Sequence, residues 1–209
     1  MARTLFIGNS LTAANDLPGM IVAVARAARG PRMDCAAVAF PNFSLEDHWQ
    51  RGDAATAIAR GRWTTVVLQQ GPSALPESRV LLREYARKFA DAIRRVRAAP
   101  ALYMVWPASA RVADFDDVRT SYQLAARDVR GLFLPVGEAW RTVWKRDSRV
   151  ELYGPDGFHP TQTATYLAAL VIYQRLTGRS PLDVPPPFAM PAARAALLQR
   201  AAADTNAAL

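Results

Sequence analysis

The chain has 209 residues, close to the size of one large domain, and 51% of them are apolar, enough to bury a substantial core. Basic residues outnumber acidic ones and give a net charge of +8. The single cysteine excludes an internal disulfide, and the two histidines, His48 and His159, stand in no metal-ligand spacing. We therefore expect one compact domain without a metal or a cofactor.

Apolar periodicity predicts five strands that alternate with helices. The strands are expected at residues 4–7, 34–40, 64–69, 101–106 and 131–136. The helices are expected at residues 17–29, 54–60, 77–98, 115–129 and 161–177, the last one ended by Gly178. Strands that alternate with helices in this way imply a parallel sheet.

The first segment with chemical potential is Gly8-Asn9-Ser10-Leu11-Thr12, directly after the apolar strand of residues 4–7. Ser10 therefore stands at the carboxyl end of a strand, where open α/β sheets bind their ligands. A serine hydroxyl becomes a useful nucleophile when a base lies beside it. The histidines are the candidates for that base.

His159 lies in the segment Asp156-Gly157-Phe158-His159-Pro160. Asp156 has a spacing suited to fixing the imidazole tautomer, and Pro160 favours extended geometry before a helix that it can start. His48 instead follows Glu46 and Asp47, a pattern typical of a helix start. We expect His159 to be the base, the alternative being that residues 156–160 form only a turn and a helix cap.

These two segments resemble the first and last blocks of the SGNH hydrolases, also called GDSL esterases and lipases, and the resemblance spans roughly residues 4–178. It implies a flavodoxin-like three-layer α/β/α sandwich with a central parallel sheet of about five strands. It also implies that Ser10 is the nucleophile, His159 the base and Asp156 the orienting acid. The Gly-x-Ser-x-Gly elbow of ordinary α/β-hydrolases does not fit, because Thr12 stands two residues after Ser10.

The middle blocks depart from the family pattern, which usually places a glycine after the second strand and an asparagine after the third. In Phe40-Pro41-Asn42-Phe43-Ser44-Leu45, Asn42 is expected to replace the glycine, because it has an N–H and tolerates positive φ. After the third strand, Gln70 is expected to replace the asparagine. The resulting oxyanion hole comprises the N–H groups of Ser10 and Asn42 and the Gln70 side chain, with Gln69 as the alternative donor. Both glutamines could also merely bond to loop backbone.

These assignments predict a serine esterase that hydrolyses small acyl esters, for example acetyl esters on carbohydrates, through an acyl-enzyme. Lipid esters remain an alternative substrate. The competing hypothesis is a non-catalytic ligand- or carbohydrate-binding module with a degenerate oxyanion hole. Trp49, Trp106 and Phe158 are candidates for pocket walls or for core packing, and Cys35 is expected in the core.

Residues 1–180 are predicted to form the hydrolase domain, and residues 181–209 a proline-rich spacer and helical extension that packs on it. The basic residues of the helix at 77–98 alternate with acidic ones and no nucleic-acid motif accompanies them, so we expect no specific nucleic-acid partner. We expect no membrane span, and a cytoplasmic protein, or an exported one if a leader has been removed. The oligomeric state is left open.

Overall fold

The computed structural model describes residues 2–209. Its centre is a sheet of five parallel strands in the order β2-β1-β3-β4-β5. The strands are β1 (Ala2–Gly8), β2 (Met33–Ala39), β3 (Thr65–Leu68), β4 (Ala99–Tyr103) and β5 (Leu132–Leu134). The predicted fold class is confirmed, and the predicted strands are present with shifted ends.

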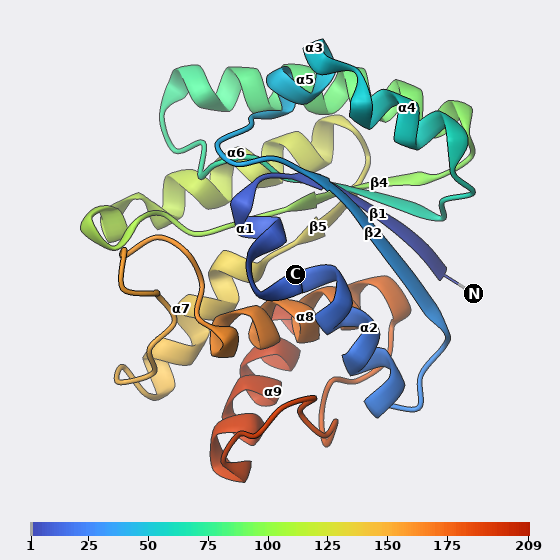
Figure 1. Ribbon diagram of the computed structural model, residues 1–209. Helices are drawn as coiled ribbons and strands as arrows, with labels where there is room; N and C mark the ends of the chain where they lie inside the picture. Colours follow the sequence, from blue (N-terminus) through green and yellow to red (C-terminus); the bar gives the residue numbers. More distant parts are fainter. Residues whose placement is uncertain (1) are drawn as a thin grey trace.

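Helices cover both faces of this sheet (Figure 1). One layer holds α3 (Leu45–Arg51), α4 (Asp53–Arg60), α5 (Pro76–Arg95) and α6 (Phe115–Asp128). The other holds α1 (Ser10–Ala13), α2 (Leu17–Ala27), α7 (Val136–Arg146) and α8 (Gln162–Thr177), with α9 (Ala192–Ala207) packed against α7 and α8. Two short 3₁₀ helices, η1 (Ala14–Asp16) and η2 (Ser109–Asp114), lie in the connections.

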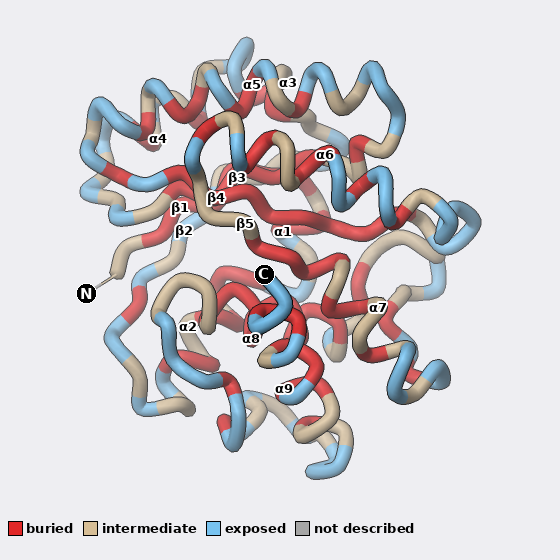
Figure 2. The backbone as a smooth tube through the Cα atoms, turned by 180° about the vertical axis from the view of Figure 1, so that it is seen from behind, coloured by how far each residue is buried: buried red, intermediate tan, exposed pale blue. Residues whose placement is uncertain are grey.

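The core lies on both faces of the sheet, as the continuous apolar runs of the inner strands require. Leu5 to Ile7 and Val66 to Leu68 are at most 1% exposed. Helix α8 is buried over the whole stretch from Ala164 to Tyr173 because it lies between the sheet and other helices (Figure 2). It ends where predicted, at Gly178, whose φ of 71° suits a glycine.

Helix α7 was missed by the sequence prediction, which extended the preceding strand to residue 136. The strand actually ends at Leu134, and Pro135 is the N-cap of α7. The helical signal was present, because Val136, Ala139, Trp140 and Val143 are buried at positions i, i+3, i+4 and i+7. The prediction for residues 131–136 thus merged the end of β5, Pro135 and the start of α7 into one strand.

The extension after residue 180 lies against the layer of α7 and α8. The Gln199 amide donates to the Val184 carbonyl at 2.6 Å, and the Tyr166 hydroxyl donates to the same oxygen at 3.1 Å. Leu198 of α9 is completely buried. Helix α9 ends at Ala207, near the end of the helical extension predicted for residues 181–209.

The strand order places the topological switch point of the sheet at the carboxyl ends of β1 and β3. The chain leaves β1 for β2 through α2 on one face of the sheet, and leaves β2 for β3 through α3 and α4 on the other. The two connections therefore diverge between these neighbouring strands, which is the position where open α/β sheets bind ligands. Ser10 follows β1, and Gln69 and Gln70 follow β3.

Candidate active site

Ser10 lies at the carboxyl end of β1, as predicted. The strand ends at Gly8, and the Asn9 side chain caps α1 by accepting a hydrogen bond from the Leu11 N–H at 3.1 Å. Ser10 is the first residue of α1 and is half-buried. Because the first N–H groups of a helix have no partner within it, the Ser10 N–H is available beside its own hydroxyl.

His159 and Asp156 lie in a short loop before α8 that Asp156 itself organises. Its Oδ1 accepts hydrogen bonds from the backbone N–H groups of Phe158 at 3.0 Å and His159 at 2.9 Å. Gly157, at a φ of 68°, allows the chain to turn back so that these N–H groups face the Asp156 carboxylate. The loop is closed by the Gly154 N–H, which donates to the His159 carbonyl at 2.7 Å.

The structure brings Ser10, His159 and Asp156 into one hydrogen-bonded row. The Ser10 hydroxyl donates to His159 Nε2 at 2.9 Å, and His159 Nδ1–H donates to Asp156 Oδ2 at 2.5 Å. The hydrogen bond from His159, assisted by two backbone N–H groups, lowers the pKa of Asp156 to about 2. The carboxylate is therefore charged at neutral pH, which favours the tautomer with its lone pair facing Ser10.

His48, the other histidine, is not the residue that contacts the Ser10 hydroxyl. It lies on α3, is completely buried, and its Nε2–H donates to the Gly8 carbonyl at 2.7 Å. Burial lowers its pKa, so the neutral form is favoured. His48 thus fixes the end of β1 beneath the serine turn.

Asn9 and Gln69 form a reciprocal amide pair under Ser10 that the sequence did not reveal. Gln69 Oε1 accepts from the Asn9 N–H at 2.9 Å and from the Thr12 hydroxyl at 2.7 Å, and Gln69 Nε2 donates to Asn9 Oδ1 at 2.9 Å. Asn9 Nδ2 in turn donates to the Phe43 carbonyl at 3.1 Å. One buried network therefore joins the turns that follow β1, β2 and β3.

Asn42 has the backbone conformation predicted for the glycine position. Its φ is 64°, in the left-handed region, and it precedes the Phe43 carbonyl held by Asn9. Among residues 2–209, no backbone or side-chain acceptor takes a hydrogen bond from its N–H. That N–H is therefore free to meet a ligand.

Gln70 follows β3 and has both side-chain polar atoms engaged. Its Oε1 accepts from the Leu45 N–H at 3.1 Å, and its Nε2 donates to the Ser73 hydroxyl at 2.8 Å. The amide would have to release Ser73 in order to donate to an oxyanion. Its role as a third donor stays a prediction.

A pocket of about 180 Å³ borders the His159 loop. It is lined by residues 72–75 and Ser78, by Pro107, Ala108, Arg111 and Asp114, and by Phe158, the neighbour of His159. Most of these side chains are apolar, and the volume is below the range for drug-sized ligands. Of the three aromatic residues proposed for a pocket wall, Phe158 takes that position.

Trp106 instead belongs to the core, stacked on Trp140 with ring centroids 3.9 Å apart. Its indole N–H donates to the Phe158 carbonyl at 2.9 Å, so it anchors the His159 loop from below. A second anchor is the Ser109 N–H, which donates to the Gly157 carbonyl at 2.8 Å. Trp49 is 37% exposed and packs edge-on against Phe89 on the outer helical layer.

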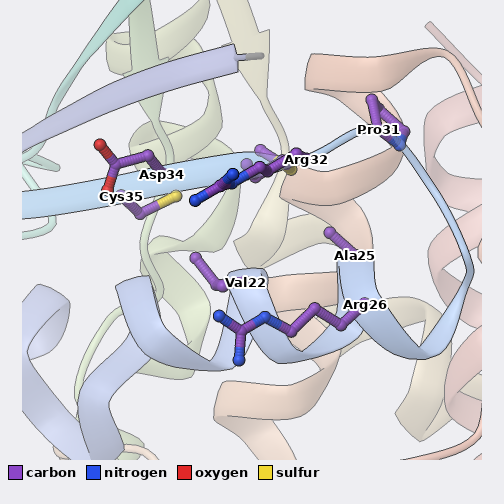
Figure 3. A pocket seen from close by; sticks show the side chains of 8 residues that line it. Val22, Ala25, Arg26, Pro31, Arg32, Asp34 and Cys35 are labelled. Atoms are coloured by element: carbon purple, nitrogen blue, oxygen red, sulfur yellow. The ribbon is translucent and has the colours of Figure 1, made fainter.

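Cys35 lies on the edge strand β2, partly buried against the core. It borders a pocket of about 460 Å³ together with Arg26 and Arg32 (Figure 3). Burial and the neighbouring Asp34 raise the pKa of the thiol to about 12, and no histidine lines the pocket. A thiol in this state is a poor nucleophile.

The basic run on α5 is partly neutralised by neighbouring acids. Arg83 and Arg87 both donate to Asp128, at 2.7 Å each, and Lys88 pairs with Glu84 at 2.8 Å. Several basic side chains of α5 are therefore paired with acidic side chains of the same protein.

Within residues 2–209, no three side chains of histidine, cysteine, aspartate or glutamate are grouped so that they could hold a metal ion. The helices described there are all too short or too polar to cross a bilayer.

No family model matches the sequence, and no curated protein matches it either. The structure is similar to that of a DUF4886 family protein from Bacteroides uniformis, with 17% identity, a TM-score of 0.83, and coverage of 98% of this chain and 94% of that one. It also resembles a protein from Slackia heliotrinireducens described as a candidate SGNH hydrolase, with 28% identity, a TM-score of 0.69, and coverage of 84% and 98%. A mutant acetyl-xylooligosaccharide esterase from Geobacillus Stearmophilus is 16% identical, with a TM-score of 0.60 and coverage of 82% and 93%.

Fold and site together define an α/β/α protein with a hydrolase fold, whose candidate site lies at the carboxyl ends of its central strands. The structures that resemble this one include SGNH hydrolases, so the resemblance predicted from the sequence extends to the fold.

Proposed function

We propose that this protein is a serine esterase in which Ser10 is the nucleophile, His159 the general base and Asp156 the residue that orients the imidazole. The observation that carries the proposal is the row of contacts at 2.9 Å between Ser10 and His159 and at 2.5 Å between His159 and Asp156. Removal of the serine proton by an adjacent, oriented imidazole is what such a row can do chemically.

In the proposed reaction, Ser10 Oγ attacks the ester carbonyl carbon while His159 Nε2 takes its proton. The tetrahedral intermediate collapses, the alcohol leaves with that proton, and the acyl group stays on Ser10. Water then attacks the acyl-enzyme with the same base, and the carboxylic acid is released. The exposure of the His159 and Asp156 side chains, 42% and 51%, gives water access to the row.

The oxyanion formed in each step is proposed to bind the N–H groups of Ser10 and Asn42. Both belong to turns joined by the Asn9 amide, so their separation is fixed before a substrate arrives. Preorganised donors of this kind stabilise charge that develops only in the transition state. Gln70 is proposed as a third donor, which acts when its amide turns from Ser73.

Small acyl groups such as acetyl are the proposed substrate class, with acetylated carbohydrates as the first candidates. Support comes from the pocket of about 180 Å³ beside Phe158, which suits a small apolar group better than a long chain. A fold relative that acts on acetyl-xylooligosaccharides makes sugar esters reasonable compounds to assay first.

The decisive experiment is labelling with a fluorophosphonate, which forms a bond to a serine oxygen as fluoride leaves, followed by peptide mapping. We expect the adduct on Ser10, hydrolysis of p-nitrophenyl acetate faster than of longer esters, and loss of both in Ser10→Ala. The matched control is Ser148→Ala, an exposed serine in the loop after α7. Equal activity in Ser10→Ala and Ser148→Ala would exclude the assignment.

A further inference from the structure

The distance between nucleophile and base depends on contacts between two segments far apart in the chain. Ser10 and His159 are 149 residues apart, and His159 lies in a loop rather than in a helix or strand. The backbone hydrogen bonds of that loop fix its internal shape. The anchors from Trp106 and Ser109 tie the loop to residues 106–109, and neither they nor the internal bonds join it to α1.

Asn15 provides a direct link between the two segments. Its Nδ2 donates to the Pro160 carbonyl at 2.9 Å and to the Thr165 hydroxyl at 2.9 Å. Pro160 directly follows His159, and Thr165 lies in the first turn of α8. Apart from the bond between Ser10 and His159, these are the side-chain hydrogen bonds that join residues 9–16 to residues 154–165 in the described part of the chain.

The backbone at Asn15 explains why an asparagine stands there. Asn15 and Asp16 both have a φ of 51°, in the left-handed region, where the chain turns from α1 into α2. Asparagine and aspartate tolerate this conformation better than most residues, but only asparagine supplies two amide hydrogens. Asp16 uses its side chain differently, accepting from the Gly19 N–H at 3.1 Å to cap α2.

We propose that Asn15 is a positioning residue that sets the separation of Ser10 and His159 by clamping the nucleophile segment to the start of α8. The inference rests on the proposed esterase mechanism for its kinetic consequence, but the clamp itself is a structural statement. A misplacement of about 1 Å between reacting groups can lower a rate about 100-fold. Loss of the clamp should therefore slow the attack by Ser10 without removing any reacting group.

The test compares Asn15→Asp with Asp16→Asn. The first keeps the shape and the tolerance of positive φ but removes both donors. The second makes the reverse exchange one residue later, keeps a capping oxygen, and leaves Pro160 and Thr165 untouched. Asn15→Gly, which also accepts positive φ, separates the loss of donors from the added charge.

We expect the rate of fluorophosphonate labelling and kcat for p-nitrophenyl acetate to fall about 10- to 100-fold in Asn15→Asp and Asn15→Gly, with KM changed less than twofold. Asp16→Asn should stay within twofold of the wild type. Similar far-ultraviolet circular dichroism and thermal midpoints above the assay temperature would establish that the variants are folded.

A second measurement does not depend on activity. The chain has two histidines, so ¹⁵N-histidine labelling gives two imidazole signal sets, assigned with His159→Gln. The Nε2 signal of His159 should shift in Asn15→Asp and Asn15→Gly toward its position in Ser10→Ala, where the hydrogen bond is absent, and should be unchanged in Asp16→Asn.

An unchanged Nε2 signal in both Asn15 variants would overturn the inference, as would equal kinetic losses in Asn15→Asp and Asp16→Asn. A wild-type protein that fluorophosphonate does not label would instead overturn the proposed esterase. In that case the imidazole signals alone decide whether Asn15 holds the two segments together.

Discussion

Removal of the Gln69 side-chain amide should destabilise the fold much more than the same change at its neighbour Gln70. Gln69→Met keeps most of the side-chain volume but leaves two buried donors, the Asn9 N–H and the Thr12 hydroxyl, without their acceptor. Gln69 Nε2 also donates to Asn9 Oδ1 and to the Gln70 carbonyl, but these acceptors keep the Leu11 N–H and the Tyr122 hydroxyl. Gln69→Met therefore isolates the cost of two unsatisfied donors.

Each unsatisfied buried donor costs about 1–3 kcal/mol, so Gln69→Met should lower the free energy of unfolding by about 2–6 kcal/mol. A domain of this size has a total stability of about 5–15 kcal/mol, and 1 kcal/mol corresponds to a shift of about 2–4 °C in Tm. The expected fall in Tm is thus about 4–24 °C. In Gln70→Met the Leu45 N–H loses its acceptor while the Ser73 hydroxyl keeps the Gly71 carbonyl at 3.0 Å, so the expected cost is about 1–3 kcal/mol.

Urea unfolding followed by circular dichroism at pH 7 measures both variants against the wild type. A destabilisation in Gln69→Met no larger than that in Gln70→Met would refute the reasoning, because it would mean that two buried donors without their acceptor cost no more than one. Loss of cooperativity in the transition of Gln69→Met would require comparison of midpoints alone.

Three further predictions concern the site. If Gln70 donates to the oxyanion, Gln70→Ala should lower kcat for p-nitrophenyl acetate about 10²–10³-fold with little change in KM. Steady-state kinetics that show no loss of kcat would mean that backbone N–H groups alone form the oxyanion hole. Because the pKa of Asp156 is lowered to about 2, this carboxylate stays charged from pH 4 upward, so Asp156→Asn should lower kcat about 10²–10⁴-fold at pH 6 as well as at pH 8. Steady-state kinetics in which the loss disappears at pH 6 would contradict this. Burial lowers the pKa of His48, so below about pH 6.5 the unfolded chain binds a proton that the folded protein does not, and the free energy of unfolding should fall. Urea titrations at pH 5 and pH 7.5 should show a smaller fall in His48→Gln than in the wild type, and an equal fall would exclude His48 as the cause.

The fold was largely predictable because its signals are local. Buried parallel strands are continuous apolar runs, and the strands at residues 4–7 and 64–69 were found for that reason. The pairing of Asp156 with His159 was likewise predictable, since three residues separate them and a turn brings both side chains together. Helix α7 was missed because nothing in a short apolar run marks the residue at which a strand ends and a helix begins.

Contacts over long distances in sequence were beyond local reasoning. Gln69 and Gln70 are adjacent and chemically identical, and only the direction of each side chain at the end of β3 decides that one joins Asn9 and the other Leu45. Asn15 carries no motif, and its partner Pro160 is 145 residues away. The left-handed backbone of Asn42 was predictable, because it depends on the residue's own φ, which asparagine tolerates.

The two halves of the proposed catalytic row are held in physically different ways, and this difference should separate the effects of mutations. Ser10 stands on a buried network of Asn9, Gln69 and His48, whose members are at most 6% exposed. Asp156 and His159 lie in an exposed loop whose hydrogen bonds compete with water. Changes beneath Ser10 should therefore lower stability and rate together, because an unsatisfied buried group acts on both. Changes in the His159 loop should lower the rate with little loss of stability, since exposed hydrogen bonds and ion pairs contribute little to folding.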